Sequence, residues 1–217
     1  MASGKELQRR VLDELDWEPS IDASQMGVAV HDGVVTLTGS VSTYAEKTTA
    51  EQATKRLVGV KAVANDLEVR PVFPSQPNDT EVAQAVLRAL EWDVNVPHEL
   101  IKARVANGFV TLEGTVNFWY QKQAAESTIR GMKGVKGIVN LISIHSVPKA
   151  IDVKTRIESA FRRSAEIDAR QIQVDTSDGK VTLRGRVRTW AERREAETAA
   201  WAAPGVTKVD DELTVGI

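Results

Sequence analysis

Hydrophobic residues recur at helical spacing three times along the chain, and a short segment of alternating apolar and polar residues follows each time. Apolar residues three and four positions apart predict amphipathic helices, whereas strict alternation predicts strands. The helical sets are Leu7, Val11, Leu12 and Leu15; Val82, Val86, Leu87 and Leu90; and Val153, Ile157 and Phe161. The strand sets are Met26, Val28 and Val30; Ile101, Ala103 and Val105; and Ile172 and Val174.

Each strand set ends in a turn motif that the chain contains three times. "HDGVVTLTGSV" at 31–41 returns as "ANGFVTLEGTV" at 106–116 and "SDGKVTLRGRV" at 177–187. Asp-Gly or Asn-Gly between alternating segments is the strongest short-range signal for a β-hairpin. A second helix is predicted from residues 43, 118 and 189, and a closing strand at Val63–Val69, Ile138–Ile144 and Val209–Val215.

The repeats predict an α+β fold of three tandem α-β-β-α-β modules. Each module is expected to have a small three-stranded mixed sheet with two helices packed on one face. The predicted bounds are 5–70 for module 1, 71–79 for a proline-rich linker, 80–145 for module 2, 146–150 for a short linker and 151–217 for module 3.

Nine glycines recur at equivalent positions, and a backbone role is predicted for all of them. The hairpin turns need positive φ, the glycine inside the second strand indicates a bulge or a close backbone approach, and the glycine after the second helix suits a left-handed C′ position. The three sets are Gly33, Gly108 and Gly179; Gly39, Gly114 and Gly185; and Gly59, Gly134 and Gly205.

The repeated unit resembles the BON domain. The resemblance rests on the "DG.VTL.G.V" hairpin, the alanine-bearing second helix and the closing strand "GV..V.N.L.V", and it covers almost the whole chain. The family occurs, often in tandem, in bacterial envelope and osmotic-stress proteins. The resemblance therefore implies binding to phospholipid or membrane surfaces or, in some architectures, to small cations. Module 3 departs from the pattern, with Asp211 where Asn65 and Asn140 stand and with Pro204 before its glycine.

Composition places the chain among ordinary soluble globular proteins. It has 217 residues, 42% hydrophobic and 27% charged, with a net charge of −2 and no cysteine. Disulfides, thiolate nucleophiles and cysteine-ligated metals are therefore excluded. The first 18 residues carry charges throughout and lack an apolar core, which predicts a cytoplasmic location for the chain as given and a periplasmic one only for a processed form. Any membrane association is expected to be peripheral.

Candidate catalytic chemistry is sparse. His31, His98 and His145 fall at positions that are not equivalent, and no phosphate-binding loop or nucleophile motif occurs. Asp175 and Asp178 precede a glycine as in part of a calcium loop, but the remaining ligands and the distal glutamate are missing. We therefore expect no enzymatic activity, no metal site and no cofactor.

Differences between the copies point to binding sites. The outward side of the second strand in module 3 is basic, and more arginines follow it, which suggests a face for anionic lipid headgroups. The alternative is a solvated face, or an interface paired with the acids of module 1. The near balance of charges in module 3, without stacking aromatics, argues against nucleic acid. The predicted anion-binding residues are Lys180, Arg184, Arg186, Arg188, Arg193 and Arg194.

Aromatic residues give a second candidate surface. Phe118 and Tyr120 replace threonine and alanine of the other copies, so with Phe109 they predict an apolar contact patch for a neighbouring module or a membrane interface. Trp201 stands where the other copies have Lys55 and Arg130, which predicts an outward contact position. Trp17 and Trp92 are equivalent and are predicted to cap the core at the end of the first helix, with ligand contact as the alternative.

The sequence thus predicts a non-catalytic binding protein that associates peripherally with anionic phospholipid in osmotic or envelope stress. Two alternatives stay open: a scaffold for protein partners in a stress response, and a module that binds potassium or calcium.

Overall fold

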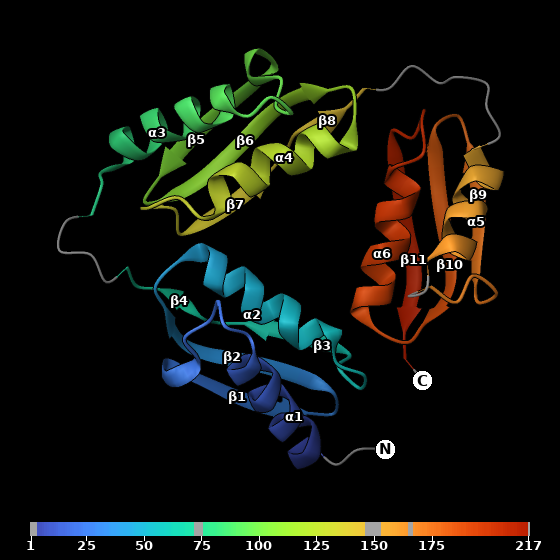
Figure 1. Cartoon of the computed structure of the whole chain (residues 1–217), viewed down its shortest axis with the longest axis horizontal. Helices are drawn as coiled ribbons and strands as arrows, with labels where there is room; N and C mark the ends of the chain where they lie inside the picture. The colour runs from blue at the N-terminus through green and yellow to red at the C-terminus, as the bar shows by residue number, and fades with distance from the viewer. Residues whose placement is uncertain (1–3, 72–75, 146–152, 165–166, 217) are drawn as a thin grey trace. The chain divides into compact units, whose positions relative to one another are not determined.

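The computed structural model describes residues 4–71, 76–145, 153–164 and 167–216 (Figure 1). Within these ranges the predicted order of elements is found three times, which confirms the α+β class. Module 1 consists of α1 (Gly4–Trp17), a 3-10 turn (Ala23–Gln25), β1 (Met26–His31), β2 (Val34–Val41), α2 (Tyr44–Arg56), β3 (Ala62–Asn65) and β4 (Glu68–Val69).

Modules 2 and 3 repeat this order. Module 2 consists of α3 (Asp79–Trp92), a 3-10 turn (His98–Leu100), β5 (Ile101–Ala106), β6 (Phe109–Val116), α4 (Trp119–Arg130), β7 (Gly137–Asn140) and β8 (Ser143–Ile144). Module 3 consists of α5 (Val153–Arg163), β9 (Ile172–Ser177), β10 (Lys180–Val187), α6 (Trp190–Trp201) and β11 (Lys208–Val215). Residues 72–75 of the predicted proline-rich linker, and the whole predicted linker 146–150, lie outside the described residues.

Each sheet is mixed, with the second strand of the module at its centre. In module 2, β6 pairs antiparallel with β5 and parallel with β7 and β8. In module 3, β10 pairs antiparallel with β9 and parallel with β11. The parallel pairing follows from the second helix, which returns the chain to the start of the sheet before the last strand.

The closing strand is interrupted in modules 1 and 2 but continuous in module 3. β3 and β4 pair with β2 in the same register on both sides of the gap, from Leu37↔Asn65 to Ser40↔Glu68. The break is therefore local and does not shift the side chains to the other face. In module 3, β11 pairs along its full length, from Lys180↔Lys208 to Val187↔Val215.

The core of each module lies between its helices and the inner side of its sheet. In module 2, for example, Val110, Leu112 and Val116 alternate along β6 and are fully buried against α3 and α4. The helical sets predicted from sequence included Leu12 and Leu87, and the structure corrects both. These side chains are 40% and 53% exposed, because neighbours in sequence lie about 100° apart around a helix.

The hairpin turns have the predicted geometry. Asp32, Asn107 and Asp178 have φ between 48° and 54°, and the glycine that follows each of them also has a positive φ. In module 2 a Cβ on Gly108 would lie 2.7 Å from the carbonyl oxygen of Gly134. This glycine is therefore needed twice, for the turn itself and for packing its backbone against the turn after α4.

The glycines after the second helix have the predicted positive φ, but they do not occupy the C′ position of that helix. α2 ends at Arg56, and Gly59 lies three residues beyond with φ of 100°. The N–H of Val60 donates to the carbonyl oxygen of Leu57, so Gly59 is the third residue of a separate four-residue turn. Gly134 and Gly205 have the same place, with Val135 bonded to Met132 and Val206 to Ala203.

The glycine inside the second strand marks a close backbone approach, as predicted. A Cβ on Gly114 would collide with the carbonyl oxygen of Leu100, and one on Gly185 with that of Gln171. Both glycines have φ above 130°. The strand therefore passes directly over the chain that enters the preceding strand.

Candidate interaction surfaces

The cations predicted on the outward face of module 3 do lie there, but two of them are paired with acids. Lys180 Nζ lies 2.6 Å from Asp210 Oδ2. Arg184 Nε lies 2.8 Å from Glu212 Oε2, and its Nη1 lies 3.3 Å from Asp175 Oδ2. These acids belong to module 3 itself, to the strands on either side of β10.

The register explains this pairing. β11 reads "KVDDELTV", and its outward positions are Lys208, Asp210, Glu212 and Thr214. Parallel pairing sets Arg184 beside Glu212 and Thr182 beside Asp210. Hydrogen bonds from Lys180 and Lys208 hold the pKa of Asp210 below its usual value. The hydrogen bond to Glu212, with the attraction of that carboxylate, raises the pKa of Arg184. The face is therefore a mixed array of charges.

The arginines that follow β10 take part in local structure. Glu192 is only 3% exposed, and its carboxylate accepts hydrogen bonds from the backbone N–H groups of Asp168 and Arg188. The side chain of Arg188 also pairs with it, at 3.3 Å. Arg193 Nε lies 2.6 Å from Asp211 Oδ2.

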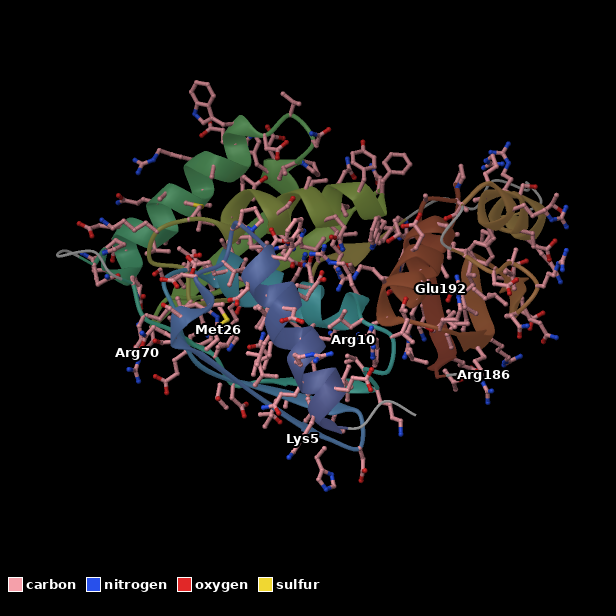
Figure 2. All side chains as sticks on the ribbon, turned by 60° about the horizontal axis from the view of Figure 1, so that its bottom comes forward. Lys5, Arg10, Met26, Arg70, Arg186 and Glu192 are labelled. Atoms are coloured by element: carbon pink, nitrogen blue, oxygen red, sulfur yellow. The ribbon has the colours of Figure 1, made fainter. Side chains whose placement is uncertain are left out.

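Two arginines of the predicted set extend into solvent. Arg186, on the outward face of β10, and Arg194, on α6, are both exposed. Arg186 has no ion-pair partner among the described residues, and Figure 2 shows its side chain pointing away from the sheet. Of the two arginines on β10, Arg186 is therefore the one that is available to an anionic ligand.

Exposed apolar side chains gather on module 2. Of the thirteen large hydrophobic residues that are exposed in the described chain, nine belong to this module and four to module 1. The nine are Leu87, Trp92, Val94, Leu100, Phe109, Phe118, Tyr120, Val139 and Leu141. A contiguous apolar patch marks a contact surface, so those of the nine that lie next to one another are the candidates.

Phe118 and Tyr120 form a stacked pair at the start of α4. Their ring centroids are 5.6 Å apart with an interplanar angle of 16°, and the residues are 50% and 52% exposed. The backbone beneath them is fixed, because the side chain of Gln121 accepts hydrogen bonds from the N–H groups of Asn117 and Phe118. The pair is therefore a rigid, half-exposed aromatic surface.

Phe109 lies elsewhere on the module, at the start of β6. A Cβ on Gly137 would meet the phenyl ring at 2.6 Å, so the ring covers that glycine. Val139 and Leu141 follow at alternate positions and are 47% and 58% exposed. We call Phe109, Val139 and Leu141 the apolar strip. Val139 and Leu141 belong to the closing strand region, so comparing the copies along the second strand alone does not identify them. Alternation along the closing strand would have identified them.

The predictions for three tryptophans differ from the structure. Those for Trp17 and Trp92 are wrong, and the outward position predicted for Trp201 is found only in part. Trp17 and Trp92 do not cap the core, since each is 84% exposed at the end of its helix. The buried positions of α1 end at Leu15, so a residue two positions later lies on the outer side of the helix. Trp201 is partly buried against the core of module 3, and its Nε1 donates to Glu197 Oε1 at 3.4 Å.

The described residues were also compared with the side-chain clusters that hold metal ions and with the helices that span bilayers. No group of three or more His, Asp or Glu side chains that could hold a metal ion occurs among them. None of the described helices is long and apolar enough to span a bilayer.

Comparison with known proteins agrees with the repeat. The family model of the BON domain matches residues 3–71, 78–146 and 152–217. This chain belongs to the BON domain family. The osmotically-inducible protein Y of Escherichia coli (strain K12), a curated relative, is 30% identical over 119 residues, which are 53% of this BON protein and 59% of that relative.

Solved structures resemble the BON protein only distantly. CdsD, a structural protein of the type III secretion system of Chlamydia trachomatis, matches with a TM-score of 0.27 and 14% identity, over 95% of this chain and 90% of that one. A second structure, of the C-terminal domain of CdsD, gives a TM-score of 0.26. A resemblance this distant indicates neither a shared arrangement of modules nor a shared function.

Proposed function

We propose that this BON protein binds anionic phospholipid surfaces peripherally, without catalysis, and that module 2 makes the apolar contact. The observation that carries the proposal is the stacked, half-exposed pair of Phe118 and Tyr120 on a module that also exposes Trp92, at 84%. Aromatic side chains favour the boundary between headgroups and acyl chains. A role in osmotic or envelope stress is part of the proposal and is supported by the name of the Escherichia coli relative.

The basic face of module 3 has a smaller part in this proposal. Its cations Lys180 and Arg184 are already paired with acids of the same face. A basic side chain near an anionic surface gains about 1 kcal/mol of attraction. A bilayer would first have to displace the paired acids, and the loss of those ion pairs offsets much of this gain. On this face of the sheet, Arg186 is the residue from which we expect direct headgroup contact.

Co-sedimentation with phosphatidylglycerol vesicles at low salt tests the proposal. The variant Phe118→Thr/Tyr120→Ala copies the residues that modules 1 and 3 have at these positions, so its fold is expected to be preserved. We expect binding to weaken at least about tenfold, because two partly inserted aromatic side chains are lost. The matched control is Val34→Thr/Val58→Thr, which removes two exposed apolar side chains from module 1.

A separate arm of the experiment addresses module 3. The variant Arg184→Ser/Arg186→Ser/Arg188→Ser is expected to lower binding less than the aromatic variant does. Equal binding by the wild type and the aromatic variant would contradict the proposal. A loss confined to the triple arginine variant would move the lipid contact to the basic face.

The apolar strip favours a second candidate function, a scaffold that binds a protein partner. Its three side chains lie on a sheet face that the module's own helices leave open, and a flat apolar face of this kind suits protein contact. A photo-cross-linking residue at position 139 tests this, with one at position 34, on the second strand of module 1, as the control. Discrete adducts at 139 alone would support the scaffold, and adducts at neither position would contradict it.

A further inference from the structure

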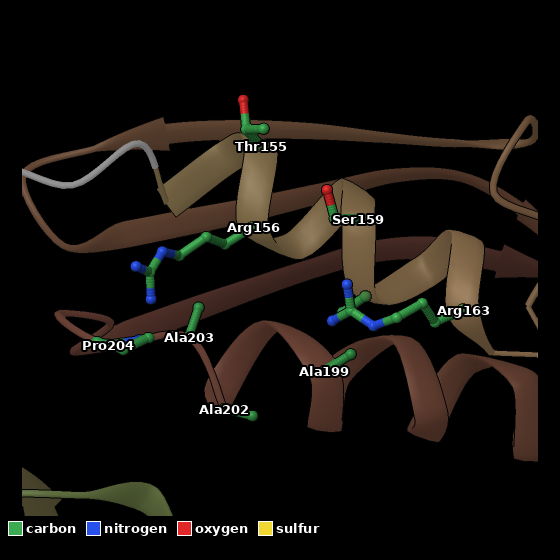
Figure 3. A pocket seen from close by; sticks show the side chains of 9 residues that line it. Thr155, Arg156, Ser159, Arg163, Ala199, Ala202, Ala203 and Pro204 are labelled. Carbon is green, nitrogen blue, oxygen red and sulfur yellow. The ribbon is translucent and has the colours of Figure 1, made fainter.

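Module 3 contains a groove between its two helices, where the other modules have polar bridges. The groove lies between α5 and α6, has a volume of about 320 Å³ and is lined by Arg156, Ala160 and Arg163 on one side and by Ala199, Ala202 and Ala203 on the other. Figure 3 shows the two arginine side chains extending from α5, with Ala199 on α6, and Ala202 and Ala203 just after that helix, on the other side of the groove.

The first two modules bridge the same helices with polar side chains. In module 1, Arg56 on α2 pairs with Glu18 at 3.1 Å and with Glu14 at 3.8 Å. In module 2, Thr128 on α4 donates to Asp93 Oδ2 at 2.6 Å. Hydrogen bonds and ion pairs thus connect the second helix with the last turn of the first helix, or with the residue just after it, next to the space that is open in module 3.

Alanine and serine replace these bridging residues in module 3. Ala202 stands where module 1 has Arg56, Ala160 where it has Glu14, and Ser164 where it has Glu18. Ala199 stands where module 2 has Thr128. The arginine, glutamate and threonine of the bridges are therefore absent, and alanines form much of the groove lining in their place.

Two arginines, Arg156 and Arg163, lie at the rim of the groove. Arg156 and Arg163 are both exposed, and neither has an ion-pair partner among the described residues. They are seven residues apart, so their Cα atoms are separated by about 10 Å along the helix. A guanidinium binds carboxylate or phosphate through paired hydrogen bonds, so this rim selects anions.

We propose that the α5–α6 groove binds a small amphiphilic anion, with a carboxylate or phosphate head held by Arg156 or Arg163 and a short hydrocarbon chain over the alanines. The volume is near the lower end for small-molecule sites, about 300–1,000 Å³, which limits the ligand to a short chain. The site is separate from the aromatic pair of module 2 and does not depend on the lipid contact proposed there.

Titration of the full chain with hexyl phosphate, followed by NMR, tests the proposal. We expect saturable shifts at the amides of Ala199, Ala202 and Ala203. Inorganic phosphate is expected to bind at least about tenfold more weakly, because it lacks the chain that would cover the alanines. Equal affinity for the two probes would overturn the proposal, and so would shifts that appear with phosphatidylglycerol vesicles but not with hexyl phosphate.

Three variants locate the site. Arg156→Ser/Arg163→Ser removes the rim, and Ala160→Glu/Ala202→Arg installs the ion pair that spans the helices in module 1. Each is expected to weaken hexyl phosphate binding at least about tenfold. Arg162→Ser is the matched control, since Arg162 is exposed on the same helix but does not line the groove. Its affinity should stay within about twofold of the wild type. Wild-type affinity in the first two variants would overturn the assignment.

Discussion

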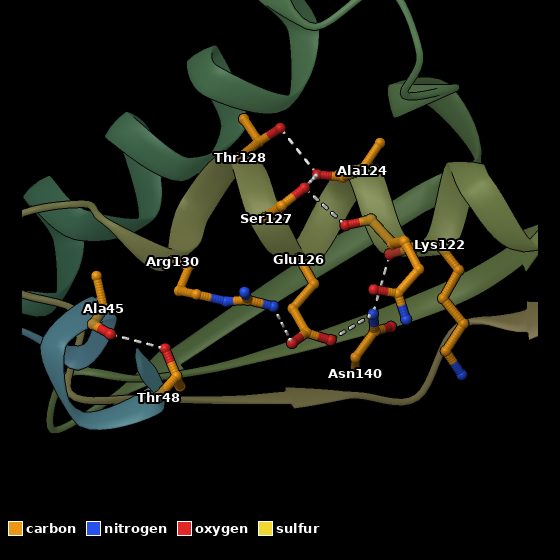
Figure 4. A network of polar contacts seen from close by, with 10 residues as sticks. Ala45, Thr48, Lys122, Ala124, Glu126, Ser127, Thr128, Arg130 and Asn140 are labelled. Atoms are coloured by element: carbon orange, nitrogen blue, oxygen red, sulfur yellow. Dashed lines mark hydrogen bonds and ion pairs between the residues drawn. The ribbon is translucent and has the colours of Figure 1, made fainter. Parts of the chain in front are cut away.

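Arg193 on α6 and Asp211 on β11 form an ion pair in module 3, with Nε and Oδ2 2.6 Å apart and side chains only 24% and 16% exposed. The other modules join the same two elements differently. Asn140 donates through Nδ2 to the Lys122 carbonyl oxygen and to Glu126 (Figure 4), and Asn65 donates to Glu51. Asp211 thus departs from the family pattern together with Arg193, which stands where modules 1 and 2 have lysine.

This pairing gives the first prediction. Arg193→Ala should destabilise module 3 by about 1–3 kcal/mol, because it leaves the largely buried carboxylate of Asp211 without its ion-pair partner. Arg193→Lys/Asp211→Asn copies module 2 and should recover most of that loss, since the introduced amide can donate to Glu197 as Asn140 does to Glu126. Urea unfolding followed by amide signals of β10 and β11 measures both. A double variant as unstable as the single one would show that the pair is not the cause.

Glu192 gives the second prediction. Its buried carboxylate accepts backbone hydrogen bonds from Asp168 and Arg188, while its own N–H donates to the Thr189 side chain at the start of α6. Glu192→Ala should cost about 2–3 kcal/mol of module 3 stability, because two N–H groups lose their acceptor. Glu192→Gln keeps one acceptor oxygen, as Gln121 does in module 2, and should cost less. The comparison is again by urea unfolding, and equal losses would contradict the role of the oxygens.

The third prediction concerns Gly114. Gly114→Ala would bring a Cβ onto the carbonyl oxygen of Leu100 at a φ of 145°. Since backbone, and not a flexible side chain, occupies the space, we expect module 2 to lose more than about 2 kcal/mol. Gly131→Ala is the matched control, because a Cβ added there would meet no atom within 4 Å. Similar stability of the two variants would contradict the close approach.

The fourth prediction is a pH dependence in module 2. The hydrogen bond from Thr128, aided by that from the N–H of Asn95, lowers the pKa of Asp93. A carboxyl whose pKa is lower in the folded state contributes stability that is present above its unfolded pKa, about 3.9, and is lost as pH falls through the folded value. Thr128→Val should therefore reduce the loss of stability on acidification below about pH 4. Hydrogen exchange at α3 and α4 between about pH 3 and 6 would show it, and an unchanged pH profile would contradict it.

Vesicle binding and groove binding should also be separable. Phe118→Thr/Tyr120→Ala is expected to lose vesicle binding and to keep hexyl phosphate binding within about twofold, because the two sites use different modules. Measuring both ligands on the same variant checks this. Joint loss would mean that one surface serves both.

The sequence by itself determined the three-module α+β fold, the order of elements and the hairpins. These features depend on local periodicity and on turn residues such as Asp32 and Gly33, whose backbone preferences act over a few neighbours. It also identified Phe118 and Tyr120 as additions to module 2, because comparison of equivalent positions needs no coordinates.

Tertiary structure alone decided which charges are satisfied and which aromatic residues are exposed. Whether Arg184 is unpaired depends on the register that sets Glu212 beside it, 28 residues away. Whether Trp92 covers the core depends on how far the buried side of α3 extends, and that side ends at Leu90. The groove between α5 and α6 depends on pairs of residues that meet only when the helices pack. Such contacts join positions distant in the chain, so local patterns cannot specify them.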